Sequence, residues 1–282
     1  MDTRELEANG MTFDVREAGP PDGDPVLLLH GFPETNHMWL GLMESLAENG
    51  YRCVAPNMRG YSSGARPEGA EHYHYEILVS DVFAIADALG FDRFHLIAHD
   101  WGSIVGFAVL SVDDSRVASY TTLAVPHYRS FAEAVRDDPE EELYRGLLNN
   151  FVDPNTAPTL SANDAVAMRA FWTSHAPEEV EDYVSVFKQP YALQAALNYY
   201  VACDKHARAL DGPVAFGPVS TPTLLLWGSD DIAIRPASVD GAAKYHSGPY
   251  KRVDLEAGHW VIQEQPDRVR DEVLAFLKEH AL

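Results

Sequence analysis

The 282-residue chain has only two cysteines, Cys53 and Cys203, and they lie far apart in the sequence. Two isolated cysteines give no disulfide framework, so we expect a fold held by a hydrophobic core in a reducing compartment, the cytoplasm. The chain also lacks an apolar run of about 18 residues, and its first ten residues, MDTRELEANG, do not resemble a signal peptide. The sequence therefore predicts no membrane-spanning helix and no membrane partner.

Basic residues are also scarce in this chain. Lys and Arg number 21 and Asp and Glu number 43, which gives a formal net charge of −22. Nucleic acids and anionic membrane surfaces are bound through excess Lys and Arg, so neither is expected as a partner. The 46% of hydrophobic and 23% of charged residues are ordinary for a globular protein, and the length suits one large domain or two small ones.

Short apolar runs alternate with helical patterns over the first 126 residues. The Asn9-Gly10 pair predicts a hairpin between strands at 3–8 and 11–17. Further strands are expected at 25–30, 51–55, 93–98 and 117–125, with helices at 37–49, 75–89 and 101–110. This alternation indicates a mostly parallel, doubly wound α/β sheet covered by helices.

The alternation stops in the middle of the chain. Residues 127–211 carry helical signals and no clear strand, including a helix start at Pro177 with acidic residues behind it. The sheet pattern then resumes, with strands at 223–227 and near 250–255 and helices near 236–246 and 266–280. We predict a core formed by 1–126 and 212–282, with 127–211 as an all-helical cap over the carboxyl edge of the sheet, where α/β proteins place their sites.

Residues 98–102, AHDWG, stand between a predicted buried strand and a predicted helix. They have the form of the strand–turn–helix nucleophile elbow, G-x-S-x-G, with Ala98 in place of the first glycine and Asp100 in place of the serine. Free N–H groups at the start of the helix would stabilise the Asp100 carboxylate. Taken alone, the pattern fits equally well with Asp100 as a simple helix N-cap.

Two later residues have the positions that a nucleophile at Asp100 requires. Asp231 follows a predicted strand and His259 follows the last one, so both are expected at the same edge of the sheet as Asp100. Their chain order, nucleophile then acid then histidine, is that of a hydrolase triad. Asp230 competes for the role of the acid, and the usual spacing of two residues after Gly228 favours Asp231.

The segment 30–35, HGFPET, follows the first buried strand. A flexible Gly31 can turn the backbone N–H of Phe32 into the site, where it would form an oxyanion hole together with the N–H of Trp101. A tight turn here also favours a cis bond before Pro33.

These motifs together resemble the α/β-hydrolase superfamily. The matching stretches are HGFPET at 30–35, NMRGY at 57–61, HDWG at 99–102, WGSDD at 227–231 and GHW at 258–260. Within the superfamily they are similar to the epoxide hydrolases and haloalkane dehalogenases, which use an aspartate nucleophile, and the resemblance covers about 1–126 and 212–282. It implies a hydrolase with Asp100 as nucleophile, His259 as base and Asp231 as orienting acid. The expected substrate pocket includes His30, Pro33, Trp39 and Trp260.

The leaving group distinguishes the two reactions. An epoxide oxygen departs as an alkoxide and needs a strong donor, and the epoxide hydrolase family uses two cap tyrosines, one of them in an Asn-aromatic-Tyr motif. Residues 198–200, NYY, match this motif, so the resemblance assigns the donor role to Tyr200. The other tyrosine usually stands four residues before a Phe, where this chain has Leu147. Tyr144, one turn earlier, either replaces it or is an ordinary packing residue.

Other readings of the same residues remain open. A haloalkane dehalogenase would hold the halide with Trp101 and a second side-chain N–H, which Phe32 lacks. A fluoroacetate dehalogenase resembles H-D-R-G-x-R, and this chain has Trp101 and Ile104 at the two arginine positions. A non-catalytic ligand-binding member of the fold would not need an intact triad. His127, in a Val-Pro-His stretch that also resembles epoxide hydrolases, fits a structural role as well.

The sequence predicts an epoxide hydrolase that takes a small apolar epoxide and water to a vicinal diol through an ester on Asp100. No cofactor is implied. His72 and His74 form a His-x-His pair, but no third ligand stands at a suitable spacing, so no metal site is expected either.

Overall fold

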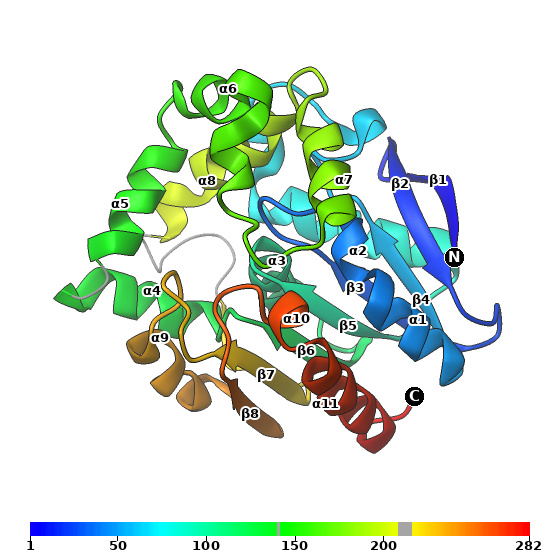
Figure 1. Ribbon diagram of the computed structural model, residues 1–282. Coiled ribbons are helices and arrows are strands. Elements are labelled where there is room, and N and C mark those ends of the chain that lie inside the picture. The colour runs from blue at the N-terminus through cyan, green and yellow to red at the C-terminus, as the bar shows by residue number, and fades with distance from the viewer. Residues whose placement is uncertain (140–141, 208–215) are drawn as a thin grey trace.

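An eight-stranded sheet in the order β1-β2-β4-β3-β5-β6-β7-β8 forms the centre of the molecule (Figure 1). The computed structural model describes residues 1–139, 142–207 and 216–282, with the backbone alone for 142–145 and 204–207. The strands are β1 (Asp2–Ala8), β2 (Met11–Ala18), β3 (Asp24–Leu29), β4 (Tyr51–Pro56), β5 (Phe94–His99), β6 (Val117–Leu123), β7 (Thr223–Gly228) and β8 (Tyr250–Leu255). The pairs β1–β2 and β2–β4 are antiparallel and the others are parallel, so the predicted mostly parallel sheet is confirmed.

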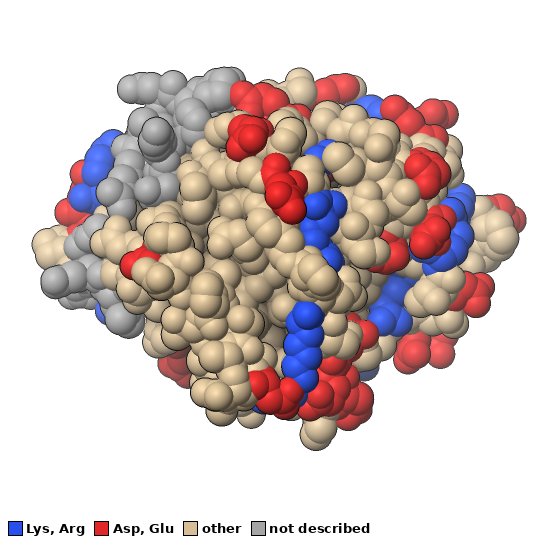
Figure 2. Space-filling model, turned by 90° about the horizontal axis from the view of Figure 1, so that it is seen from above, with Lys and Arg blue, Asp and Glu red and all other residues tan. Residues whose placement is uncertain are grey.

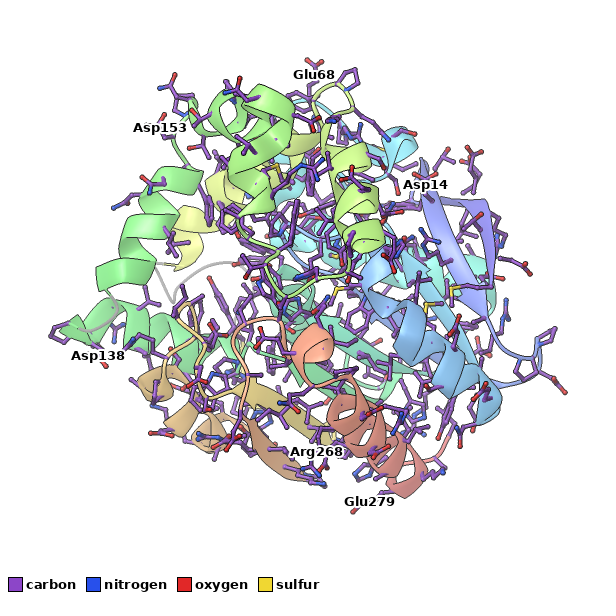
Figure 3. The ribbon with its side chains drawn as sticks, in the orientation of Figure 1. Asp14, Glu68, Asp138, Asp153, Arg268 and Glu279 are labelled. Atoms are coloured by element: carbon purple, nitrogen blue, oxygen red, sulfur yellow. The ribbon has the colours of Figure 1, made fainter. Side chains whose placement is uncertain are left out.

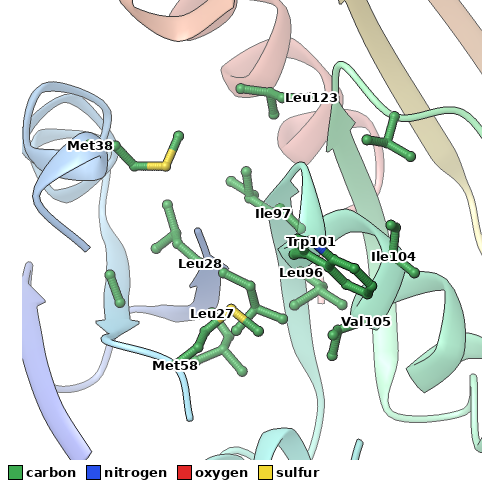
Figure 4. Packing of buried hydrophobic residues seen from close by; sticks show 14 of the residues in the cluster. Leu27, Leu28, Met38, Met58, Leu96, Ile97, Trp101, Ile104, Val105 and Leu123 are labelled. Carbon is green, nitrogen blue, oxygen red and sulfur yellow. The ribbon is translucent and has the colours of Figure 1, made fainter. Parts of the chain in front are cut away.

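The central strands are apolar along their whole length because both faces of the sheet are covered. Leu27 and Leu28 of β3 and Leu96 and Ile97 of β5 are completely buried, and Figure 4 shows Leu96 beside Val105 of the neighbouring helix. Strands buried on both faces read as continuous apolar runs instead of alternating ones. This is why the sequence pattern located these strands to within one or two residues.

Two sets of helices cover the sheet. They are α1 (Leu40–Glu48), α2 (Tyr75–Leu89), α3 (Trp101–Val112), α9 (Pro236–Asp240), α10 (Val261–Glu264) and α11 (Pro266–Glu279). Helices α2 and α3 pack together on one face, and α1 and α11 pack together on the other (Figure 1). The expected helix at 37–49 begins with a 3₁₀ turn, η1 (Asn36–Trp39). The helix expected at 236–246 is divided at Gly241 into α9 and a 3₁₀ turn, η5 (Ala242–Tyr245).

Between β6 and β7, the described residues form five α-helices. They are α4 (Tyr128–Asp137), α5 (Glu142–Phe151), α6 (Thr156–Arg169), α7 (Pro177–Phe187) and α8 (Ala192–Ala207). Figure 1 shows α5 to α8 as a layer at the top of the molecule, above the carboxyl ends of the central strands. We call these four helices the upper layer. Helix α7 begins at Pro177 with Glu178 and Glu179 in its first turn, as the sequence indicates.

Charged groups lie mainly at the periphery of the molecule, as the labelled side chains of Glu68, Asp153 and Arg268 illustrate (Figure 3). Figure 2 looks down on the upper layer, where acidic side chains are spread around the rim instead of forming one patch. In the described ranges, no helix combines the length and apolarity needed to span a membrane.

Four histidines have a pKa that burial lowers: His30, His95 and His127 are buried, and His246 is partly buried. Burial lowers the pKa of His30, His95 and His246 to about 4 and that of His127 to about 3. In the unfolded chain each imidazole titrates near ~6.5. Below this pH the unfolded chain binds more protons than the folded one, so acid favours unfolding. We expect the free energy of unfolding to fall progressively between about pH 6.5 and pH 4, because the unfolded chain takes up protons that the buried histidines do not.

His246 offers a direct test of this pH dependence. Its ring stacks on Tyr250 with centroids 4.2 Å apart, and neither ring nitrogen has a hydrogen-bond partner among the described residues. His246→Phe should keep the packing and remove the titrating group. Between pH 7 and pH 5 the variant should lose about 1–2 kcal/mol less unfolding free energy than the parent, measured by urea denaturation. The exposed His72, changed to Gln, is the control, and an unaltered pH slope in His246→Phe would contradict the expectation.

Candidate active site

Asp100 occupies the sharp turn by which β5 runs into α3. Its backbone has φ +50° and ψ −119°, a conformation that is strained for any residue other than glycine. Two glycines permit this geometry. A Cβ on Gly102 would overlap the carbonyl oxygen of Leu29, and a Cβ on Gly31 would overlap the Asp100 side chain itself. The loop after β3 and the start of α3 therefore approach each other closely around the carboxylate.

The structure brings the three predicted triad residues together. His259 Nε2 lies 3.5 Å from Asp100 Oδ2, and His259 Nδ1 lies 2.7 Å from Asp231 Oδ2. The Asp231 side chain is fully buried, whereas those of Asp100 and His259 are 17% and 13% exposed. The competing Asp230 is exposed, so Asp231 is the carboxylate placed to orient the imidazole.

Backbone hydrogen bonds hold the loops that carry Asp231 and His259 together. The N–H of Ser229 donates to Leu255 O at 2.8 Å, and that of Asp230 donates to Ala257 O at 2.9 Å. On Asp231, Oδ1 accepts hydrogen bonds from the N–H groups of Ala233 and Ile234, at 2.7 and 2.9 Å. These bonds leave Oδ2 directed at the imidazole.

The predicted donor loop lies against the other oxygen of Asp100. The backbone N–H of Phe32 donates to Asp100 Oδ1 at 2.8 Å, and the bond between Phe32 and Pro33 is cis. Trp101 is the first residue of α3, immediately behind the carboxylate. The two oxygens of Asp100 thus face different groups, an N–H donor on one side and His259 on the other.

The carboxylates and the imidazole of the triad shift one another's pKa values toward the charged forms. Burial alone would lower the pKa of His259, but the charges of Asp231 and Asp100 and their hydrogen bonds raise it well above its usual value. Burial alone would likewise raise the pKa of Asp100, but the hydrogen bonds from His259 and Phe32 and the neighbouring imidazoles lower it. Both shifts favour the ionised form of Asp100 and the protonated form of His259.

Helices α5 and α8 contribute aromatic side chains that lie near this carboxylate. The Tyr200 ring from α8 meets Trp101 edge-on with centroids 5.0 Å apart, and it lies 5.6 Å from Phe32 and 4.7 Å from Phe151 of α5. Tyr200 is therefore next to Trp101 and Phe32, the residues on either side of the Asp100 carboxylate in the structure. Tyr144 belongs to α5, but its side chain lies outside the described residues.

Comparison with known proteins identifies the family of this fold and triad. Residues 24–266 match the family model described as the alpha/beta hydrolase fold. The chain belongs to the α/β-hydrolase family. It is a hydrolase of the epoxide hydrolase type, since its similar relatives include epoxide hydrolase 4 of Mus musculus, with 31% identity over 97% of this chain and 78% of that protein.

Two mycobacterial proteins are similar over almost their whole length. Epoxide hydrolase A of Mycobacterium tuberculosis is 29% identical over 97% of this chain and 96% of the relative. The crystal structure of epoxide hydrolase A from Mycobacterium thermoresistibile superimposes with a TM-score of 0.87 at 26% identity, over 100% of this chain and 99% of that one.

The expected pocket residues of this α/β-hydrolase have different surroundings. His30 is fully buried, and both of its ring nitrogens are occupied, by Gly31 O at 3.0 Å and by the N–H of Met58 at 3.0 Å. It therefore joins the two loops through both ring nitrogens, and its contact with a substrate stays a prediction. Trp39 is also completely buried within the core, and Pro33 is buried. Trp260 is partly exposed, with its ring 5.0 Å from that of His259.

Sequence reasoning missed a buried carboxylate next to the triad. Glu34 Oε2 lies 2.9 Å from Nδ1 of His99, and His99 Nε2 lies 3.1 Å from the carbonyl oxygen of His259. Burial would raise the pKa of Glu34, but hydrogen bonds from His175 and His99 lower it to about 2. The only local signal was a charged residue in a segment that follows a fully buried strand.

His127 has a structural role: its ring accepts a hydrogen bond from the N–H of Arg129 at the start of α4.

Proposed function

We propose that this α/β-hydrolase opens an epoxide to a vicinal diol through a covalent ester between the substrate and Asp100. The observation that carries the proposal is that the two carboxylate oxygens of Asp100 have different neighbours. Oδ1 accepts the Phe32 N–H at 2.8 Å, whereas Oδ2 lies 3.5 Å from His259 Nε2, so Oδ2 is the less tightly bound oxygen and the candidate nucleophile. A carboxylate attacks saturated carbon well when a leaving group is present.

In the first step, a lone pair of Asp100 Oδ2 forms a bond to an epoxide carbon as the bond between that carbon and the ring oxygen breaks. The oxygen leaves as an alkoxide and takes a proton from a donor. Tyr200 is the candidate donor, because its ring is next to Trp101 and Phe32 at the carboxylate. Such general-acid assistance is worth about 10²–10⁴ in rate.

In the second step, His259 Nε2 accepts a proton from water, and the water oxygen attacks Cγ of Asp100. Esterification of Asp100 removes the negative charge that helps to raise the pKa of His259, so the imidazole becomes a base only after the first step. The tetrahedral oxyanion forms on Oδ1, within reach of the Phe32 N–H, and we assign the Trp101 N–H as its second donor. Loss of one such donor typically costs about 3 kcal/mol. Collapse of the intermediate breaks the bond between Cγ and Oδ2, and the leaving oxygen takes the proton held by His259. The second proton of the water restores the tyrosine donor, so the diol is released and Asp100 is again a carboxylate.

We further propose that residues 127–211 act as a cap over this chemistry. Helices α5 and α8 contribute Phe151 and Tyr200, whose rings lie 5.4 and 5.6 Å from that of Phe32. Apolar rings around the nucleophile would exclude bulk water and favour an apolar epoxide. Low local polarity also strengthens the hydrogen bonds to the developing charges.

A substrate panel tests the proposal against its alternatives. The panel contains styrene oxide, a terminal alkyl epoxide, 1-bromobutane, fluoroacetate and a nitrophenyl ester, with diol, halide and nitrophenol all measured. We expect diol from at least one epoxide at a rate at least about 10-fold above halide release, because a tyrosine donor assists alkoxide departure and adds little for bromide. Faster release of bromide than of any diol would favour the haloalkane dehalogenase alternative, with Trp101 as the halide donor. Binding without turnover of any compound would favour a non-catalytic binding protein.

A further inference from the structure

A second cluster of polar side chains lies where the upper layer meets the core, apart from the triad. Glu34 comes from the loop after β3, His175 from the segment before α7, and Glu179 from the first turn of α7. One ligand atom of each residue lies within 4.8 Å of the other two. The side chains of Glu34 and His175 are fully buried, and Glu179 is partly exposed at the edge of the cluster.

Gln263 occupies the space between the two carboxylates. Its Nε2 group donates to Glu34 Oε1 at 2.7 Å and to Glu179 Oε1 at 3.0 Å, so one partly positive group bridges two oxygens that would otherwise repel each other. The Tyr183 hydroxyl, 2.5 Å from Glu179 Oε1 and 3.3 Å from Glu34 Oε1, has only one proton to share between them. Gln263 Oε1 is buried beside this group and has no hydrogen-bond partner among the described residues.

We propose that Glu34, His175 and Glu179 bind a divalent first-row transition-metal ion, with Zn²⁺ as the best match, and that the ion joins α7 to the core. Two carboxylate oxygens and one imidazole nitrogen form a mixed ligand set that suits zinc. Glu34 Oε1 and His175 Nε2 share a hydrogen bond at 3.1 Å, and an ion about 2.1 Å from each atom would replace the proton between them. The imidazole makes calcium and magnesium, which take oxygen ligands, poorer candidates.

The surroundings supply the other parts of a metal site. The second oxygen of Glu34 is held 2.9 Å from His99 Nδ1, an outer contact of the kind that orients a metal-binding carboxylate. Glu179 and Gln263 also line a surface groove of ≈ 720 Å³ that gives an ion a path from solvent. A rotation of the Gln263 amide would remove its Nε2 group from between the carboxylates and present the unpartnered Oε1 as a fourth ligand.

The proposed ion is structural, because none of its ligands is a triad residue. Glu34 lies on the loop that carries the Phe32 N–H, and His175 lies 141 residues further along the chain. The ion would therefore fasten the donor loop to the upper layer. Such a distant pair has no spacing signal, which explains why no ligand set was expected from the sequence.

Zinc binding to the whole protein tests this site. After dialysis against EDTA, titration calorimetry with Zn²⁺ should show one equivalent bound, and the melting temperature should rise by about 5 °C at a zinc concentration ~100 times the dissociation constant. Glu179→Gln and His175→Gln should each weaken binding at least about 10-fold, since each loses a direct ligand. Glu178→Gln is the matched control, because Glu178 lies on the same turn of α7 and lines the same groove but is outside the cluster.

Cobalt(II) in the wild-type protein keeps the test independent of how the variants fold. Co²⁺ should occupy the site with the visible absorption of a tetrahedral ion, and Zn²⁺ should displace it. The proposal is overturned if no stoichiometric binding is found, if the cobalt spectrum is that of the hydrated ion, or if folded Glu179→Gln and His175→Gln proteins bind as tightly as Glu178→Gln. Because calorimetry and melting need no substrate, this result does not depend on the proposed epoxide chemistry.

Discussion

His259→Gln should stop turnover while leaving the first chemical step intact. The variant loses the base that activates water, and a general base is worth about 10²–10⁴ in rate, so steady-state turnover should fall by at least about 10³. Asp100 and the Phe32 N–H that holds its Oδ1 at 2.8 Å are unchanged, so alkylation continues. Mass spectrometry of the variant mixed with an epoxide should show a protein heavier by one whole substrate molecule.

Asp100→Asn is the control for the adduct. Its amide nitrogen is a poor nucleophile, so no mass increase should occur although the shape of the site is kept. With excess wild-type enzyme in water enriched in the heavy oxygen isotope, the first diol formed should carry no heavy oxygen, and Asp100 should acquire it. If His259→Gln binds substrate without forming an adduct, and the first diol is labelled, covalent catalysis by Asp100 is excluded.

Tyr200→Phe should slow alkylation by an epoxide at least about 10-fold, less than the full general-acid range if a second donor contributes. A phenol in free solution has a pKa of about 10 and can protonate an alkoxide, whereas bromide gains little from a proton. The ring remains to pack against Trp101 and Phe151, at 5.0 and 4.7 Å, so the fold should persist. The rate of adduct formation in the His259→Gln background measures this step separately from hydrolysis.

The neighbouring tyrosine gives a matched control for the loss of a hydroxyl. Tyr199 is also in α8 and is buried, but its O–H donates to the backbone carbonyl of Arg59 at 2.8 Å. Tyr199→Phe should therefore cost about 1 kcal/mol of stability and leave alkylation unchanged. If Tyr144 is the second donor, adding Tyr144→Phe to Tyr200→Phe should slow alkylation further. Unchanged epoxide alkylation in Tyr200→Phe would remove the tyrosine from the mechanism.

The layout of the sheet could be predicted from local patterns alone. The apolar runs of β3, β5 and β7 mark strands buried on both faces, and the Asn9-Gly10 pair, with both φ angles positive, marks the hairpin. Because the carboxyl ends of parallel strands share one edge of a sheet, the positions of Asp100, Asp231 and His259 at strand ends already predicted that they would be neighbours.

Only the tertiary structure decided which individual atoms meet. The spacing after Gly228 favoured Asp231 over Asp230, and the structure adds the N–H groups of Ala233 and Ile234, which hold the Asp231 side chain in the interior. His30 was expected in the substrate pocket, and only the structure shows that its Nε2 accepts a hydrogen bond from the N–H of Met58.

By itself, then, the sequence determined the strands, the elbow and the order of the triad, because each depends on periodicity or on spacing within a short segment. The tertiary structure decided which atoms join Asp231 to His259, the burial of His30 and the convergence of Glu34 with His175 across 141 residues. The last of these contacts depends on how the segment before α7 packs against the loop after β3, and packing between distant segments leaves no period in the chain.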